Sequence, residues 1–168
     1  MNRADFQAIY AYSDNCWRVM GTALTAAPNA WNTPFETISK WNSVRLLLAH
    51  SIASEERIVT VRLKGLEVAV PYEERAAESW EGLYRDQQTV RQATYDYIAS
   101  LSDSELTSGE KVISSLGGGP PLTRADALFH LSNHENYCRG EVISAIQRLG
   151  FDPPNFDYVL LKDSLLNL

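Results

Sequence analysis

Three side chains of the sequence could together bind a metal ion: His50, His134 and Cys138. His134 and Cys138 are four residues apart, and side chains at positions i and i+4 lie above one another on one face of an α-helix. From a facing helix, His50 would complete a triangle of ligands. Two imidazoles and a thiolate leave one position of the metal open to water or a thiol, as in catalytic zinc sites.

Each of these residues also has a purely structural interpretation. A core histidine commonly hydrogen-bonds a carbonyl or a carboxylate, and a cysteine in a helix commonly packs as a small apolar side chain. His130, four residues before His134, could replace one of the ligands or lie just outside the ligand set. Spacing alone therefore leaves open whether a metal is bound.

Side chains that could transfer a proton near such a metal are Tyr137, Glu135 and Glu141. Each of them can equally lie on a helix surface or cap a helix end, so the sequence assigns no general base and the catalytic residues stay unknown. In the structural interpretation, Gly140 lets another helix approach closely and Arg139 pairs with a neighbouring carboxylate.

The segments that carry the three candidate ligands have the hydrophobic periodicity of helices. A helix predicted over residues 38–64 centres His50 on an apolar stripe. A second helix, predicted over residues 123–149 with Thr123 as its N-cap, turns His134 and Cys138 toward one buried face. These two helices must face each other for the metal triangle to form.

The remaining elements are also helical. Helices are predicted over residues 5–26 and 72–100, followed by a short tail helix over residues 155–166. The glycine- and proline-rich stretch 102–121 is predicted as a loop, in which residues 111–116 could pair weakly as a strand. The fold class is therefore all-α, a four-helix bundle with a short C-terminal helix, connected either antiparallel or through a crossover.

Composition limits the class of protein further. A length of 168 residues with 45% apolar and 21% charged residues predicts a single globular domain over residues 1–168. The formal net charge of −6 and the lack of a basic run argue against nucleic acid and anionic lipid as partners. Without a signal peptide or an apolar stretch of about 18 residues, we expect a cytoplasmic protein whose two cysteines, Cys16 and Cys138, are thiols.

Residues 128–142, with Asn-His-Glu at 133–135 and Cys-Arg-Gly at 138–140, resemble the last bundle helix of the DinB-like family of damage-inducible bacterial proteins. That helix typically reads Asn-His-Glu, two further positions and His-Arg-Gly, and ends in Leu-Gly and a proline turn, as at 149–154 here. Leu-Ala-His at 48–50 and the segment 12–20 are similar to the family's histidine-bearing helix and its first helix.

The resemblance implies a four-helix bundle that binds nickel, zinc or iron through one histidine of the second helix and a histidine pair of the last. Carried over to this chain, the ligands are His50 and His134, while Cys138 stands where the family has its third histidine. A thiolate adds negative charge and shifts the preference toward softer metals. The same difference is equally consistent with a chain that has lost its metal.

The resemblance also implies two classes of function. One is a metal-dependent thiol S-transferase or hydrolase that acts on a small molecule, since relatives use mycothiol, bacillithiol or glutathione-like cofactors. The alternative is a non-catalytic stress-response protein, a homodimer that binds metal or a small ligand or has a degenerate metal site. An open pocket leading to the metal would favour the enzyme, and a sealed site would favour the alternative.

Overall fold

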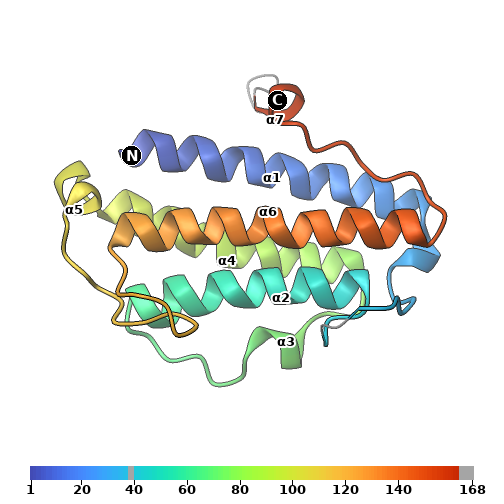
Figure 1. Ribbon diagram of the computed structural model, residues 1–168, viewed down its shortest axis with the longest axis horizontal. Helices are drawn as coiled ribbons and strands as arrows, with labels where there is room; N and C mark the ends of the chain where they lie inside the picture. Colours follow the sequence, from blue (N-terminus) through green and yellow to red (C-terminus); the bar gives the residue numbers. More distant parts are fainter. Residues whose placement is uncertain (38–39, 163–168) are drawn as a thin grey trace.

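The computed structural model describes residues 1–37 and 40–162. Its four long helices are α1 (Arg3–Ala26), α2 (Val44–Glu56), α4 (Trp80–Ser100) and α6 (Arg124–Arg148). They lie side by side as a bundle, as Figure 1 shows, and the described residues contain no strand beyond an isolated bridge between Ile113 and Leu122. The predicted all-α class and four-helix bundle are confirmed.

The connection between α2 and α4 is a crossover. In Figure 1, α1 and α6 run in one direction along the bundle, and α2 and α4 run in the other. The chain therefore returns along the bundle between α2 and α4, and the short helix α3 (Tyr72–Arg75) lies on this return segment and packs against α2. The crossover thus brings residues far from α2 in sequence to the side of that helix.

Polar caps set the beginning of the helices that carry the candidate ligands. Ser43 precedes α2 in an extended conformation, and its hydroxyl accepts a hydrogen bond from the Leu46 N–H. Thr123 and Asp126 form a reciprocal capping box at the start of α6, as the predicted N-cap required. These caps satisfy N–H groups that have no partner within the helix.

Three predicted boundaries were wrong, and local hydrogen bonding explains each. The first two residues of the predicted helix 38–64 lie outside the described residues. The helix begins at Val44, because Ser43 caps it, and it ends as a π-helical segment, η2 (Arg57–Leu63). The predicted helix 72–100 is interrupted, because the Ser79 side chain accepts from the Gly82 N–H and starts α4 anew. The predicted loop contains a further helix, α5 (Asp103–Thr107), which a capping box at Ser102 stabilises.

The core lies between the four helices and is mostly apolar, with Trp17, Leu47, Leu83 and Ile146 almost fully buried. The predicted tail helix is confirmed only as the short α7 (Tyr158–Leu161), and its predicted C-terminal part lies outside the described residues. Among the described residues, we find no helix with the length and apolar character to cross a bilayer.

Candidate metal centre

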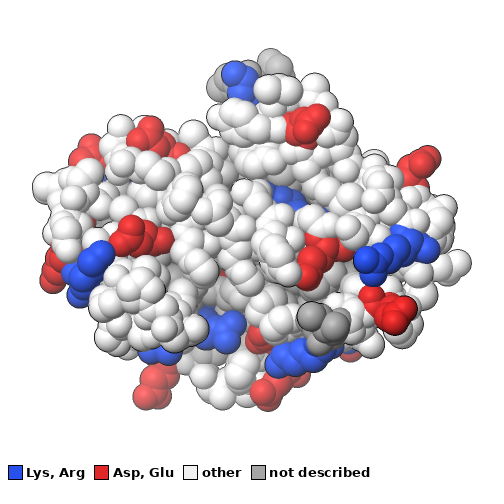
Figure 2. Space-filling model, in the orientation of Figure 1, with Lys and Arg blue, Asp and Glu red and all other residues white. Residues whose placement is uncertain are grey.

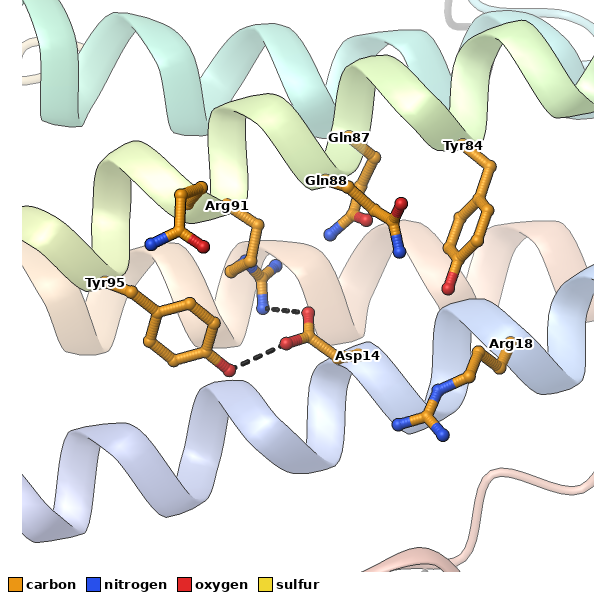
Figure 3. A pocket seen from close by; sticks show the side chains of 8 residues that line it. Asp14, Arg18, Tyr84, Gln87, Gln88, Arg91 and Tyr95 are labelled. Atoms are coloured by element: carbon orange, nitrogen blue, oxygen red, sulfur yellow. Dashed lines mark hydrogen bonds and ion pairs between the residues drawn. The ribbon is translucent and has the colours of Figure 1, made fainter. Parts of the chain in front are cut away.

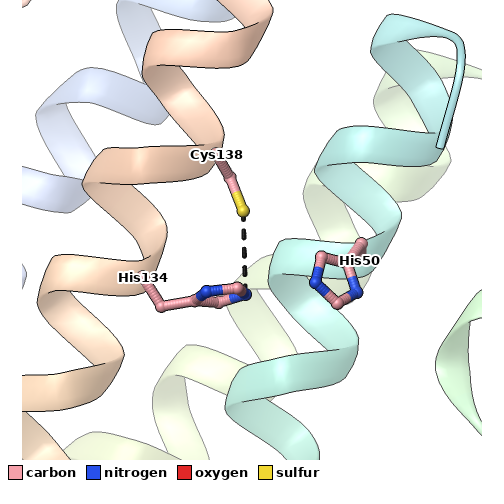
Figure 4. Close-up of side chains that lie close together, drawn as sticks. All are labelled: His50, His134 and Cys138. Atoms are coloured by element: carbon pink, nitrogen blue, oxygen red, sulfur yellow. Dashed lines mark hydrogen bonds between the residues drawn. The ribbon is translucent and has the colours of Figure 1, made fainter. Parts of the chain in front are cut away.

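The facing sides of α2 and α6 bring His50, His134 and Cys138 together, as the sequence predicted. One ligand atom from each residue lies within 4.8 Å of the other two. Cys138 Sγ is 3.7 Å from His134 Nε2, and the two imidazole centroids are 5.1 Å apart with nearly perpendicular rings. Figure 4 shows the thiol and both rings pointing into the space between the two helices.

The three donors fit a zinc-like metal ion. Ligands held at about 2.0–2.3 Å from one tetrahedral ion lie about 3.3–3.8 Å from each other. The 3.7 Å between the thiol sulfur and His134 already satisfies this condition. The widest separation, 4.8 Å, needs a closure of about 1 Å. Two imidazoles and a sulfur donor form a set that zinc and iron accept.

His50 is held from two sides. Its Nδ1 lies 3.2 Å from Glu73 Oε1 on α3, so Nε2 is the nitrogen left for a metal. The indole of Trp41 stacks on the ring with centroids 3.5 Å apart. The residue is 9% exposed, and this burial lowers the pKa of His50, although Glu73 works in the opposite direction. A neutral imidazole oriented by a carboxylate is the state in which histidine binds metals.

His134 has polar neighbours on both helices. Its Nε2 lies 3.1 Å from the Ser54 hydroxyl, one helical turn beyond His50 on α2. Burial, and then the neighbouring His50, lower the pKa of His134 from 6.5 to about 4. The imidazole therefore stays neutral at physiological pH. The exposed His130 stacks beside His134 with ring centroids 6.1 Å apart, but it is not one of the three convergent donors.

The lowered pKa of His134 predicts a pH-dependent stability of the metal-free protein. In the unfolded chain the imidazole takes up a proton near pH 6.5, whereas in the folded protein it does so only near pH 4. Below pH 6.5 the unfolded state binds more protons, so the free energy of unfolding falls as the pH decreases toward 4. We expect His134 to contribute on the order of 1–3 kcal/mol to this fall.

Urea unfolding of chelator-treated protein between pH 7 and pH 4 measures this contribution. His134→Asn should show a shallower pH dependence than the wild type, because it lacks the titrating group. His130→Asn is the control that keeps His134, and its pH dependence should stay steeper than that of His134→Asn. Equal slopes for the wild type and His134→Asn would contradict the prediction.

Cys138 is the most buried of the three residues, at 2% exposure. Burial, followed by the nearby carboxylates Glu141 and Glu135, raises the pKa of its thiol to about 12. A metal ion at this site must therefore displace the thiol proton, so its affinity depends on pH. Cys138 and Cys16 are both free thiols, as predicted.

Of the other candidates on α6, Glu141 is half-buried and lies near the Cys138 thiol. Tyr137 is 65% exposed at the surface. A Cβ on Gly140 would meet no atom within 4 Å, so the predicted close approach of another helix is wrong. Arg139 does pair with a carboxylate, since its Nη1 lies 3.1 Å from Glu135 Oε1. Glu135 itself is buried and belongs to a network of charges in the bundle core.

That network centres on Arg91, which receives one carboxylate from each of the other three long helices. The guanidinium contacts Glu55 of α2 at 2.9 and 3.0 Å, Glu135 of α6 at 2.9 Å and Asp14 of α1 at 3.1 Å. Burial by itself raises the pKa of Glu135, but the charge of Arg91, and then that of Arg139, lowers it to about 2. Glu135 is therefore a permanent carboxylate and a structural anchor rather than a general base.

Sequence reasoning missed the residues that surround the candidate ligands. Ser54 could have been found, because it follows His50 by four residues on the same helical face. Glu73 and Trp41 carried no such signal. They come from the crossover segment and from the stretch before α2, and only the tertiary structure brings them to His50.

Access to the centre is limited in the described structure. One cavity beside the centre, of about 140 Å³, is lined by Glu73, Arg57, Glu56 and Ala53, together with apolar residues of η2 and the crossover segment. His50, His134 and Cys138 line none of the described cavities. His50 and Cys138 are thus buried and His134 is half-buried, with Trp41 over one face of His50.

Comparison with known proteins agrees with this arrangement. The sequence model of the DinB family matches residues 6–165, a range that includes α1 to α6 almost entirely and all three candidate ligands. No curated protein matches the chain.

Proposed function

This chain belongs to the DinB family, and we propose that it binds a divalent metal ion through His50, His134 and Cys138 and uses the ion in a reaction on a small molecule. The observation that carries the proposal is the convergence of three donors from two helices to within 4.8 Å. Neutral histidines and a displaceable thiol proton support metal binding rather than a proton relay.

Zinc or iron suits this donor set better than nickel does. The sulfur of Cys138 is a softer donor than the histidine that the DinB-like pattern has at this position. It adds a negative charge to the site, which makes the metal a weaker Lewis acid than three neutral imidazoles would. Catalytic zinc sites with three protein ligands include sets that mix histidine and cysteine.

Three protein ligands favour catalysis, because a tetrahedral ion then keeps one position for water or a thiol. A bound metal would lower the pKa of that water or thiol and so supply a nucleophile at neutral pH. Glu73 orients His50 through Nδ1, and Trp41 excludes water from one face of the same ring. The reaction class we propose is thiol S-transfer or hydrolysis.

A non-catalytic role is the second candidate, and the burial of the site favours it. His50 and Cys138 are 9% and 2% exposed, and none of the described cavities is lined by a candidate ligand. In this case the chain would be a stress-response protein that stores or senses a metal or a small ligand. The choice between the two depends on whether a substrate reaches the fourth position of the metal.

Several properties stay predictions: a single domain, a cytoplasmic location, a homodimer and the lack of nucleic acid partners. The last of these is supported by the surface charges. Figure 2 shows acidic and basic side chains interspersed on the visible face, with no continuous basic patch. The formal net charge of −6 is consistent with this distribution.

Elemental analysis of the purified protein tests the metal proposal. We expect about one equivalent of zinc or iron per chain after purification without chelator or metal-affinity resin. The loaded protein should then consume a low-molecular-weight thiol with a panel of small electrophiles, while apo-protein should not. Metal without turnover supports the second candidate, and a chain that neither contains nor takes up metal contradicts the proposed metal site.

A further inference from the structure

A polar cavity away from the metal centre lies between α1 and α4. It has a volume of about 530 Å³ and receives no residue from α2 or α6, the helices of the candidate ligands. Figure 3 shows side chains of both helices turned toward this space. The lining residues are Asp14 and Arg18 of α1, and Tyr84, Gln87, Gln88, Arg91, Gln92 and Tyr95 of α4.

The α4 wall of this cavity is a continuous polar stripe. Each of its six residues has another of them three or four positions away, and the six include three glutamines and two tyrosines. A helix face that meets a neighbouring helix normally carries apolar residues at this spacing. Here the apolar contact is replaced by amide, phenol and guanidinium groups, which supply hydrogen-bond donors and acceptors along the groove.

At the buried end of the cavity, the charged groups of Arg91 and Asp14 are already paired with each other. Arg91 is 3% exposed, and Asp14, Glu55 and Glu135 all contact its guanidinium. The Tyr95 hydroxyl donates to Asp14 Oδ2 at 2.7 Å, which fixes the carboxylate in the cavity wall. An anion would meet the Asp14 carboxylate, and a cation would meet Arg18 and Arg91. The electrostatics therefore favour a neutral ligand.

Gln87 is the side chain that points to a ligand. It is 2% exposed, lines the cavity and lies near Asp14, yet its Nε2 makes no aligned hydrogen bond with any described residue. The Asp14 carboxylate, the acceptor beside it, is already bound by Arg91 and Tyr95. An acceptor on a bound molecule would therefore give the buried amide a better-aligned partner. Gln88, exposed on the next position of α4, offers a second amide at the rim.

We propose that this cavity binds a neutral polyhydroxylated molecule of the sugar or polyol class. A hydroxyl both donates and accepts hydrogen bonds, and neighbouring hydroxyls match the paired donor and acceptor of a glutamine amide. Tyr84, held by stacking on Trp80, adds an aromatic surface at one end for the C–H face of a sugar ring. The site is separate from the metal centre and does not depend on the proposed function.

Side-chain amide resonances of ¹⁵N-labelled protein test the proposal. The probes are maltose and myo-inositol as neutral polyols, sodium phosphate as an anion and choline chloride as a cation, all at matched ionic strength. We expect at least one polyol to shift the Gln87 amide signals saturably at millimolar concentration, and the two ions to leave them unchanged. No shift with either polyol, or saturable shifts only with an ion, would overturn the proposal.

Variants locate the binding. Gln87→Leu retains the size of the side chain and removes the unpaired amide, so we expect a folded protein with polyol affinity reduced at least about tenfold. Gln88→Ala, at an exposed position, should weaken binding without affecting the fold. Gln7→Leu, at an exposed position of α1 outside the cavity, is the matched control. Full affinity in both Gln87→Leu and Gln88→Ala would contradict the assignment, and chelation of metal should change none of these results.

Discussion

Replacing His50 with alanine is expected to weaken Zn²⁺ binding at least about 100-fold, because loss of a residue that only supports a ligand already costs about 10- to 100-fold. His50 is the only one of the three convergent donors that α2 supplies. Without it the site keeps two donors from one helix, spaced four residues apart, which bind far less tightly than a triangle. Competition titration with a chromophoric chelator measures the change.

Substitutions at Cys138 separate a ligand from a packed side chain. Cys138→Ala should lose at least about tenfold in affinity, whereas Cys138→His should keep the site and shift its preference toward harder metals. His130→Ala is the matched control, since His130 is exposed and outside the convergent set, and we expect wild-type affinity. Wild-type affinity in Cys138→Ala combined with a loss in His130→Ala would show that His130 is the third ligand.

Replacing Arg91 with leucine should remove much of the stability of the protein. The change leaves the buried Glu55 and the half-buried Asp14 without their cationic partner and takes one of two cationic partners from Glu135. Breaking a buried ion pair in this way typically costs about 3–5 kcal/mol. Such a loss is a large fraction of the stability of about 5–15 kcal/mol that is usual for a domain. Urea unfolding at pH 7 measures it.

Arg85→Leu is the control for this experiment. Arg85 is exposed on the same helix, and the same substitution there should change the free energy of unfolding by no more than about 0.5 kcal/mol. A loss below about 1 kcal/mol in Arg91→Leu would mean that the carboxylates find other partners or become protonated at little cost.

The Arg91 network also explains why the candidate ligands are held in register. Glu55 directly follows Ser54, which contacts His134, and Glu135 directly follows His134 itself. Because both carboxylates bind the same guanidinium, the network ties α2 to α6 at the level of the metal centre. The centre is therefore positioned by buried charges as well as by apolar packing.

The sequence by itself determined the helical class, the helices that carry the candidate ligands and the inward direction of His50, His134 and Cys138. Apolar residues at intervals of three and four specify the buried face of a helix without reference to its partners. For the same reason the N-cap at Thr123 could be predicted from a short stretch of chain. The match to the DinB family rests on this same local information.

Only the tertiary structure decided the crossover between α2 and α4, the contact of Glu73 and Trp41 with His50, and the burial of Glu135. The i, i+4 spacing offers Glu135 a partner in Arg139 on its own helix, but its second cation, Arg91, belongs to α4, 44 residues earlier in the chain. Burial of a charge is stable only when opposite charges from other helices surround it. Such a condition depends on how the helices pack, and no spacing within one helix encodes it.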